Sequence, residues 1–391
     1  MLFVQDGHGP GTKVTSSLKK GLADGLILEP RTKSSTTIAK YIEAIQDEYP
    51  EKRILFDPQF FASVIKADTY GKLNSYPYFK LLNSASDFTP KKLEQYVKET
   101  IDYQCDLGLT EIISPALIMD SFDSREQIIN AGMYELSENM ICILGSYLKL
   151  YLSLPINELA LQQKEQLLEF LNTITNSKVY GFYIFIDRVR SDNLQWTDPQ
   201  RLANVMYIVN VLKDNNYDVI VGYVDMYSIL LKAAGASIVA NGWNKKQKHF
   251  TKDRFKQSRG GLRKNKYTSI QLLNSIFIDE ELQPIYQAGL IDDVIMNGAT
   301  DSKLRNSPAS QEWTQGEEVM HYWTVIKTVM TEIESKDSIN KRLDYLKKII
   351  NNAAATYVLL KANNISFHPE TGPQFLSVWQ EAITLFEAEV S

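Results

Sequence analysis

The sequence predicts an α/β protein, a (β/α)8 TIM-type barrel followed by a C-terminal helical appendage. Short apolar runs alternate with longer amphipathic stretches through the first two-thirds of the chain, as in proteins built from repeated strand–helix units. Eight candidate strands fall within about 300 residues, which suits such a barrel. An open doubly wound sheet would carry a glycine-rich phosphate loop after an early strand, and the chain lacks the spacing of GxGxxG and of GxxxxGKS/T.

Most candidate strands are continuous apolar runs, as expected for parallel strands that are covered on both faces. They are Leu2–Gln5, Gly25–Leu28, Arg53–Phe56, Thr110–Ser114, Val179–Ile186, Asp218–Val224, Ser237–Ala240 and Asp293–Met296. Helices are predicted between them because apolar residues recur at helical spacing, as in Ser34–Glu48 and Arg201–Lys213. Right-handed crossovers would then join the strands into a parallel sheet.

The remaining segments are predicted to be helical. The stretch from about 124 to 175, between the fourth and fifth predicted strands, is interpreted as a helical insertion into the barrel. Residues 299–316 are polar and rich in turn formers, so we expect the barrel domain to span residues 1–298. Helical patterns at Glu317–Asn352 and from about Pro373 to Val390 predict a helical region over residues 299–391.

Composition excludes several classes of protein. The 391 residues include 42 Lys and Arg against 47 Asp and Glu, so the net charge of −5 gives no global argument for nucleic acid. The two cysteines favour a reducing compartment, and with only four histidines besides them a structural zinc site is not expected. Neither a metal nor a cofactor is predicted. The N-terminus lacks the pattern of a signal peptide, and the apolar stretch Met140–Leu154 is shorter than the roughly 20 residues of a spanning helix. We therefore expect a cytoplasmic protein without membrane association.

Acidic residues directly follow five of the predicted strands. They are Asp6, Glu29, Asp57, Asp187 and Asp225. Because the reactive groups of barrel enzymes stand at the C-terminal ends of the strands, we expect these side chains on one rim. Carboxylates there could act as nucleophiles, as general acids or bases, or as metal ligands. The alternative is that they are polar only because strands end at the surface.

Asp57 is the strongest single catalytic candidate. It follows the apolar strand Arg53–Phe56 and precedes a proline, which removes a backbone donor and ends the sheet. The sequence therefore predicts that its carboxyl group lies at the barrel mouth and serves as the catalytic acid or base. Gln59 would offer an amide to the edge of a base or sugar, and the two phenylalanines that follow it would form a stacking face or ordinary core.

Two further acids are predicted to act with Asp57. The strand Val179–Ile186 delivers Asp187 next to Arg188, and a neighbouring positive charge lowers the pKa of a carboxyl group. An ionised carboxylate suits a nucleophile or a group that stabilises a cation, whereas a surface ion pair is the alternative. Asp225 follows an apolar run in the same way.

Residues 244–266 form the most distinctive local feature, which we call the basic segment. It contains ten Lys or Arg residues and one acid, Asp253, a local balance of +9. His249, Phe250 and Phe255 are interleaved and could stack on unpaired bases while the cations hold phosphates. The alternative is a solvated loop. The predicted substrate-binding residues are Glu29, Gln59, Arg188, Asn241, Lys245, Lys246, Lys248, His249, Arg254, Arg259 and Arg263.

Four segments follow one another in a recognisable order and spacing: Gly21–Pro30, ILFDPQFF around Asp57, Val179–Ile186 and Val221–Trp243. Over about 200 residues this layout resembles the tRNA-guanine transglycosylase family, including its DNA-modifying relatives. Asp57 falls at the aspartate of that family's DSGGFQ motif. The resemblance implies a barrel that exchanges bases in nucleic acid.

Two departures from that family affect the expected chemistry. Its nucleophilic aspartate would lie near Ala240 and Asn241, and an asparagine cannot form the covalent glycosyl intermediate. Its CxCxxC…H zinc motif is also missing from the C-terminal region. The resemblance therefore implies either that Asp187 or Asp225 has taken over as nucleophile, or that the protein binds nucleic acid or a nucleoside without exchanging bases.

Three functions are consistent with these patterns. The first is an enzyme of transglycosylase or glycosylase type that acts on RNA, DNA or a nucleoside through rim carboxylates and a basic phosphate-binding loop. The second is a catalytically silent barrel that binds nucleic acid or partner proteins, in a multi-protein assembly. The third is a hydrolase or lyase of a small anionic substrate. Trp313, Tyr322 and Trp323 are expected to be exposed and to form a subunit contact, as in a homodimer.

Overall fold

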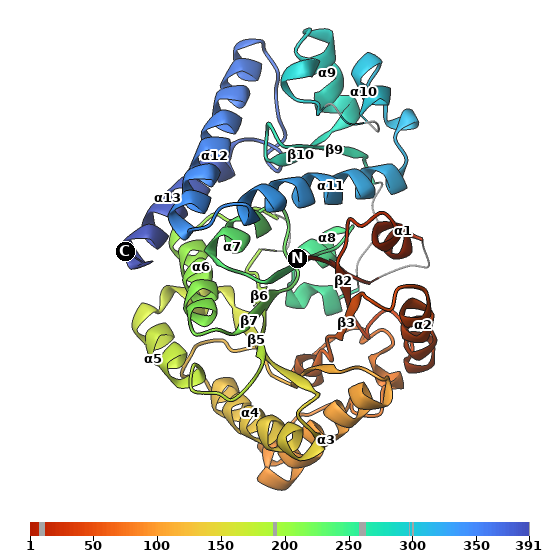
Figure 1. Cartoon of the computed structure of the whole chain (residues 1–391), viewed down its shortest axis with the longest axis vertical. Helices are drawn as coiled ribbons and strands as arrows, with labels where there is room; N and C mark the ends of the chain where they lie inside the picture. Colours follow the sequence, from red (N-terminus) through yellow and green to blue (C-terminus); the bar gives the residue numbers. More distant parts are fainter. Residues whose placement is uncertain (8–11, 191–193, 258–262, 297, 299–300, 391) are drawn as a thin grey trace. The chain divides into compact units, whose positions relative to one another are not determined.

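The fold is the predicted (β/α)8 barrel, seen here in a computed structural model that describes residues 1–7, 12–190, 194–257, 263–296, 298 and 301–390. Eight parallel strands form one sheet that closes almost completely (Figure 1). Their bounds are β1 (Leu2–Gln5), β2 (Gly25–Leu28), β3 (Arg53–Phe56), β4 (Glu111–Ile113), β5 (Lys149–Asn157), β6 (Gly181–Asp187), β7 (Asp218–Val221) and β8 (Ile238–Asn241). They are hydrogen-bonded in the order β3-β2-β1-β8-β7-β6-β5-β4.

Helices connect the strands, and α2, α3, α4 and α5 lie around the outside of the sheet (Figure 1). The helices of this region are α1 (Lys13–Lys19), α2 (Ser35–Glu48), α3 (Pro90–Asp106), α4 (Arg125–Leu144), α5 (Lys164–Ile174), α6 (Pro199–Asp214), α7 (Ser228–Ala234) and α8 (Lys245–Lys248). Serine hydroxyls cap two of them, since Ser34 accepts from the Thr37 amide and Ser124 from the Gln127 amide, both at 3.3 Å. The apolar face of α2 is buried through Ile38, Ile42 and Ile45, as its spacing predicted.

Seven of the eight predicted strands are present. The structure has one strand that was not predicted, β5, and it lacks the strand that was predicted at 293–296. The predicted helical insertion at 124–175 is wrong, because this region contains the strand β5 between α4 and α5. The strand contains Pro155, and because proline seldom lies inside a sheet, the sequence argues against a strand there. It is accommodated because β4 pairs only with the start of β5, so Pro155 lies beyond that ladder.

The predicted strand at 293–296 is also wrong. Residues Ile291–Asp293 form a short helical turn, and the amides of Val294 and Ile295 bond back to the Ile291 carbonyl. Val294 and Ile295 are buried, so the apolar run reflects packing around a turn rather than a strand. The eighth strand of the barrel is therefore β8.

Side chains close the seam between β3 and β4, the two ends of the hydrogen-bonded order. Arg53 at the start of β3 donates to Glu111 at the start of β4 at 2.9 Å, and it also bonds Asp218 at 3.2 Å. The carboxamide of Gln104 on α3 bonds both the amide and the carbonyl of Ile113, at 2.9 and 2.8 Å. The edge of β4 that faces away from β5 is thus satisfied by a helix side chain.

The chain divides into two compact units, which we describe separately. The first comprises Met1–Asp192, Ile208–Asp225 and Gly235–Ser258, and it contains all eight strands of the barrel. The second comprises Asn193–Tyr207, Met226–Ala234 and Arg259–Ser391. The second unit thus begins before the predicted boundary at residue 298 and also includes two segments from the region assigned to the barrel.

The second unit is mostly helical, with one antiparallel hairpin that the sequence did not predict. Besides α7 and the first part of α6, its helices and strands are β9 (Lys266–Ser269), β10 (Asn274–Phe277), α9 (Gln283–Gln287), α10 (Ser302–Asn306), α11 (Gln315–Glu334), α12 (Ile339–Ala362) and α13 (Gln374–Val390). Trp313, Tyr322 and Trp323 are at most 2% exposed. The expectation that they form an exposed subunit contact is therefore wrong, because they belong to the core.

Among the helices of the described residues, none has the length and apolar character needed to cross a membrane.

Candidate functional site

The carboxyl ends of the barrel strands carry a set of buried acids, four of which were predicted; the fifth, Glu158, follows the unpredicted strand β5. Asp6 follows β1, Glu29 follows β2, Asp57 follows β3, Glu158 follows β5, and Asp187 is the last residue of β6. All five are at most 5% exposed. Buried carboxylates are costly unless they are paired or hydrogen-bonded, so their partners decide what each one does.

Most of these rim acids form ion pairs. Lys33 bonds Asp6 at 2.5 Å, Arg188 bonds Glu158 at 2.8 Å, and Arg254 bonds Glu29. Lys252 lies 3.4 Å from Asp187, and Lys248 lies 3.4 Å from Asp225. Asp57 differs, since among the described residues no Lys or Arg lies within ion-pair distance of its carboxyl group.

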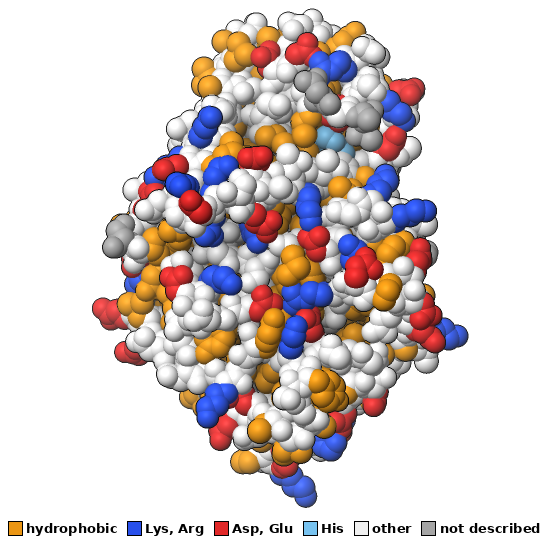
Figure 2. Space-filling view, viewed as in Figure 1, with side chains coloured by type: hydrophobic (Ala, Val, Ile, Leu, Met, Phe, Trp, Pro, Cys, Tyr) orange, Lys and Arg blue, Asp and Glu red, His pale blue; other side chains and the backbone are white. Residues whose placement is uncertain are grey.

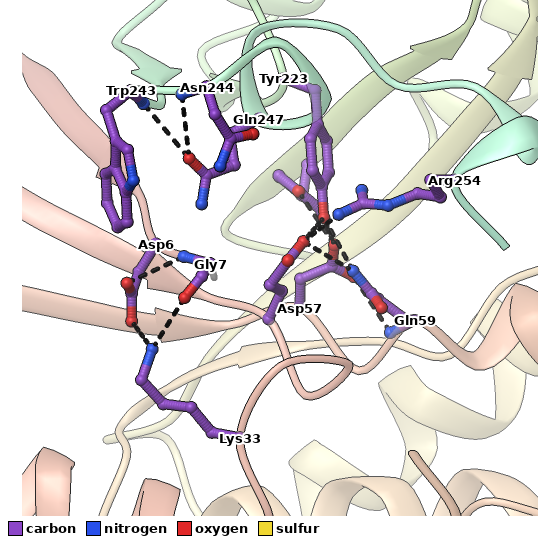
Figure 3. A network of polar contacts seen from close by, with 12 residues as sticks. Asp6, Gly7, Lys33, Asp57, Gln59, Tyr223, Trp243, Asn244, Gln247 and Arg254 are labelled. Atoms are coloured by element: carbon purple, nitrogen blue, oxygen red, sulfur yellow. Dashed lines mark hydrogen bonds and ion pairs between the residues drawn. The ribbon is translucent and has the colours of Figure 1, made fainter. Parts of the chain in front are cut away.

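Hydroxyl and amide groups hold Asp57 instead (Figure 3). Its Oδ2 accepts hydrogen bonds from the hydroxyls of Tyr223 at 2.9 Å and Tyr183 at 3.3 Å. Its Oδ1 accepts from the backbone amide of Gln59 at 3.1 Å. Burial raises the pKa of Asp57 to about 6, although these bonds favour the ionised form. A carboxyl group of this kind can exchange a proton near neutral pH.

Gln59 connects Asp57 to the neighbouring acid, Glu29. The Gln59 Nε2 group donates to the Tyr223 hydroxyl oxygen at 2.9 Å and to Glu29 Oε2 at 3.3 Å. Arg254 donates to the same oxygen of Glu29. The structure therefore brings together four predicted site residues (Asp57, Glu29, Gln59 and Arg254) in one buried network.

The backbone of this network is strained at two positions. Gln59 has φ 50° and Tyr223 has φ 54°, the left-handed region that side-chain-bearing residues rarely adopt. The side chains of these two residues are hydrogen-bonded to each other, and both contact Asp57. Such conformations cost of order 1–3 kcal/mol each and cluster at functional sites. Because both positions belong to one hydrogen-bonded network, we take this network as the candidate site.

Aromatic rings pack beside the network. Phe250 lies against Phe185, Tyr223 and Phe61, with ring centroids 4.6, 5.3 and 5.2 Å apart. Phe250 is fully buried and Phe255 is 1% exposed. The expectation that these two rings stack on bases from a surface loop is therefore wrong, because both are core residues of the first unit.

The basic segment is largely neutralised by acids from elsewhere in the chain. Among the described residues, at least seven of its cations form ion pairs: Lys248, Lys252, Arg254, Lys256, Arg263, Lys264 and Lys266. Lys256 pairs with the segment's own acid, Asp253, and the other six pair with acids from outside the segment. On the face shown in Figure 2, Lys and Arg side chains are intermixed with Asp and Glu. The local excess of charge in the sequence is therefore much smaller in the folded protein.

Asp187 has different partners from those expected. Arg188 was expected to hold it ionised, but Arg188 pairs with Glu158. Lys252 contacts Asp187 instead, through its backbone amide at 3.0 Å and its side chain at 3.4 Å. Burial nevertheless raises the pKa of Asp187 to about 6, so the predicted lowering is wrong.

The other predicted binding residues are dispersed. Asn241 is buried at the end of β8 and donates to the Val224 carbonyl at 2.7 Å. His249 is 4% exposed, whereas Lys245 and Lys246 are exposed on α8. Arg263 belongs to the second unit, where it bonds Glu318 at 2.7 Å. Arg259 lies outside the described residues.

A second polar cluster lies around the end of β1 (Figure 3). Asp6 accepts from the Gly7 amide at 2.8 Å, and Lys33 bonds the Gly7 carbonyl at 3.2 Å. Gln247 accepts from the amides of Trp243 and Asn244 at 3.2 and 3.3 Å. A Cβ on Gly7 would lie 1.9 Å from Nε2 of Gln247, so a larger residue there would require the Gln247 side chain to move.

Sequence reasoning missed both tyrosines of the Asp57 network. Tyr183 lies within β6, where a run of apolar and aromatic neighbours hides a hydroxyl that points to Asp57. Tyr223 was assigned to the strand 218–224, but β7 ends at Val221 and the chain bends at Tyr223. A Cβ on Gly222 would lie 2.7 Å from the Tyr183 hydroxyl. A glycine directly before Tyr223 was therefore the one local hint in the sequence that a side chain packs closely here.

No protein-family model matches this chain, and no match is found among curated proteins. The class of this protein therefore follows from its structure alone: it is a (β/α)8 barrel in which tyrosine hydroxyls bind a buried carboxyl group, that of Asp57, near the barrel mouth. Within the described ranges, no group of three or more His, Cys, Asp or Glu residues is arranged to hold a metal ion.

Proposed function

We propose that this protein is an enzyme that acts on the glycosidic bond of a nucleoside-type substrate, with Asp57 as its general acid. The observation that carries the proposal is the state of Asp57: it is buried, held by Tyr223, Tyr183 and Gln59, and its pKa is raised to about 6. The other four rim acids each contact a cation, whereas Asp57 contacts none among the described residues. A raised pKa in a strained, buried network is typical of catalytic acids.

Glu29 supports a division of roles between two carboxyl groups. It is ion-paired with Arg254, whereas Asp57 is not paired with a cation. In the proposed reaction, the Asp57 proton passes to a ring nitrogen of the base while the bond from the sugar carbon to the base breaks and its electrons go to the base. The Glu29 carboxylate faces the positive charge that develops on the sugar. Water or a second base then adds to the sugar carbon and returns a proton to Asp57.

Buried amides support a substrate with a hydrogen-bonding edge. Among the described residues, neither polar atom of the Gln5 side chain nor the Gln59 Oε1 atom has a hydrogen-bond partner, although both residues are fully buried. Buried polar groups are normally paired, so these orphaned atoms favour a ligand that pairs with them. A planar heterocycle with hydrogen-bond donors and acceptors along its edge meets that requirement.

The pairing of the basic segment favours a small substrate over a long polyanion. It also keeps the small-molecule alternative open: a hydrolase or lyase of an anionic compound would use the same Asp57. We do not assign the attacking role to Asp187 or Asp225, because the carboxylate of each contacts a lysine.

The test is the turnover of a panel of nucleosides and nucleotides by the wild type and by Asp57→Asn. We expect the variant to lose at least 100-fold in kcat, the typical contribution of a positioned acid, while substrate affinity changes little. Asp187→Asn is the matched control, since its carboxyl group has a similarly raised pKa but is bound to Lys252. Full turnover by Asp57→Asn would disprove the proposal and favour the catalytically silent alternative.

A further inference from the structure

Two guanidinium groups lie near Glu29 with part of their hydrogen-bonding capacity unused. Arg254 is 3% exposed, and one of its Nη atoms bonds Glu29. Its Nε and its other Nη atom are buried without a hydrogen-bond partner among the described residues, and the same holds for Nε of Arg31. Unpaired buried donors of a charged group are expensive, so a binding partner for them is expected.

Aromatic rings fix the positions of both groups. The Arg254 guanidinium lies over the rings of Tyr223 and Phe250, 4.9 and 5.2 Å from their centroids. The Arg31 guanidinium lies over Phe255 at 5.4 Å. Stacked guanidiniums keep their planar fork of donors in one orientation, which is the arrangement that binds phosphate and carboxylate oxygens well.

Like charges lie close together at this position among the described residues. Arg31, Arg254 and exposed Lys246 interact electrostatically with one another, and Glu29 is the carboxylate that acts on all three. Burial, and then the neighbouring Arg254, lowers the pKa of Arg31. Burial, followed by Arg31 and Arg254, lowers the pKa of Lys246. Arg31 and Arg254 thus place two guanidinium charges close to one carboxylate, Glu29, and a bound anion would reduce their mutual repulsion.

We propose that Arg31 and Arg254 form an anion subsite that binds a single phosphate group, so that the substrate is a mononucleotide rather than an uncharged nucleoside. The inference rests on the proposed function for the nature of the substrate, but the subsite itself does not depend on catalysis by Asp57. Glu29 orients Arg254 through one Nη atom and leaves the other donors for phosphate oxygens. A single phosphate suits this pair, since most cations of the basic segment are already paired within the chain.

The test measures binding of inorganic phosphate to the full chain by calorimetry. We expect the wild type to bind phosphate and Arg31→Gln to weaken this binding about tenfold or more, as loss of a charge-assisted contact does. Arg254→Lys, which keeps the charge but loses the fork, should also weaken it. Arg125→Gln is the matched control, because Arg125 is also stacked on an aromatic ring, that of Phe88, and is exposed.

Further binding measurements distinguish a failure of this inference from a failure of the proposed function. Asp57→Asn should bind phosphate as the wild type does, so a dead but phosphate-binding variant supports both proposals. The wild type should bind a nucleoside 5′-monophosphate at least tenfold more tightly than the nucleoside, and Arg31→Gln should lose that preference. Failure of the wild type to bind phosphate, or equal loss with Arg125→Gln, would overturn the subsite. Much tighter, steeply salt-dependent binding of an oligonucleotide would overturn the choice of a mononucleotide.

Discussion

The hydroxyl of Tyr223 donates a 2.9 Å hydrogen bond to Oδ2 of Asp57 and thereby joins the turn after β7 to the turn after β3. Both turns depend on a residue in the left-handed region, Tyr223 itself and Gln59. The contact thus ties two strained backbone segments to one carboxyl group. Because the bond favours the ionised carboxylate, its strength adjusts the proton affinity of Asp57.

Tyr223→Phe should therefore raise the pKa of Asp57 above its value of about 6. A hydrogen bond to a charged group contributes about 1.5 kcal/mol, so the shift should be about one pH unit. If Asp57 is a general acid, the pH above which kcat/KM falls moves upward by that amount. Tyr183→Phe, which removes a longer 3.3 Å bond, should shift it less. An unchanged or downward shift in Tyr223→Phe would contradict the assignment.

Asp57→Asn should stabilise the folded protein at neutral pH. The folded-state pKa of about 6 exceeds the ordinary value of 3.8, so the folded state binds the proton more tightly than the unfolded state. The stability from this group is complete below about pH 4 and is lost as the pH rises through 6. At pH 7 the loss is on the order of 2–3 kcal/mol, and the asparagine variant avoids it.

Urea denaturation at a series of pH values measures this effect. The variant should gain stability relative to the wild type between pH 4 and 6 and keep that gain above pH 6. Asp337→Asn, which changes an aspartate whose side chain is 73% exposed, serves as the control and should show no such pH-dependent gain. A stability difference that does not vary with pH would show that Asp57 is not perturbed by burial.

Arg53→Met should destabilise the end of the barrel opposite the site. Arg53 bonds Glu111, Asp218 and the Tyr151 hydroxyl at 2.9, 3.2 and 2.6 Å, so its loss leaves two partly buried acids without this partner. Because its side chain is 23% exposed, we expect a cost of about 2 kcal/mol rather than the 3–5 of a fully buried pair. Chemical denaturation measures this cost, while kcat of the folded fraction should stay unchanged. Lys341→Met, at an exposed pair, should change neither quantity.

Gly7→Ala should damage the polar cluster at the end of β1. The new methyl group would lie 1.9 Å from Nε2 of Gln247 and 2.9 Å from Oε1 of Glu29, so both side chains must move. We expect lower thermal stability and weaker substrate binding, because Glu29 belongs to the proposed site. Gly132→Ala is the control: its Cβ would lie no closer than 3.7 Å to a neighbouring side chain, and alanine within a helix adds up to about 1 kcal/mol of stability. Equal behaviour of the two variants in thermal melts would contradict this account.

The strand pattern was predictable because buried parallel strands read as continuous apolar runs, which seven segments display. The missing strand, β5, carries Pro155 in its interior, and local propensity alone argues against a strand there. At 293–296 the error is the reverse, because a strand was predicted where the chain forms a buried turn. A buried turn requires the same apolar residues as a buried strand. Only the tertiary arrangement distinguishes these cases.

The candidate site was predictable in its acids and not in their partners. Glu29 and Asp57 follow from their positions after strands, since strand ends form the rim of a barrel. The tyrosines that bind Asp57 are separated from it by more than a hundred residues, and nothing local shows that they converge. The sequence overstated the charge of the basic segment for the same reason. The acids that neutralise its cations come from other parts of the chain.

The carboxamide of Gln104 has a consequence for how this protein behaves at high concentration. An incompletely closed sheet has two free edges, and free edges recruit strands from other molecules and promote aggregation. Gln104 presents an amide acceptor and donor to Ile113 much as the backbone of an adjacent strand would. One side chain on α3 thus occupies both backbone polar groups of Ile113 that a strand from another molecule would need, and we expect this to disfavour edge-to-edge association at β4.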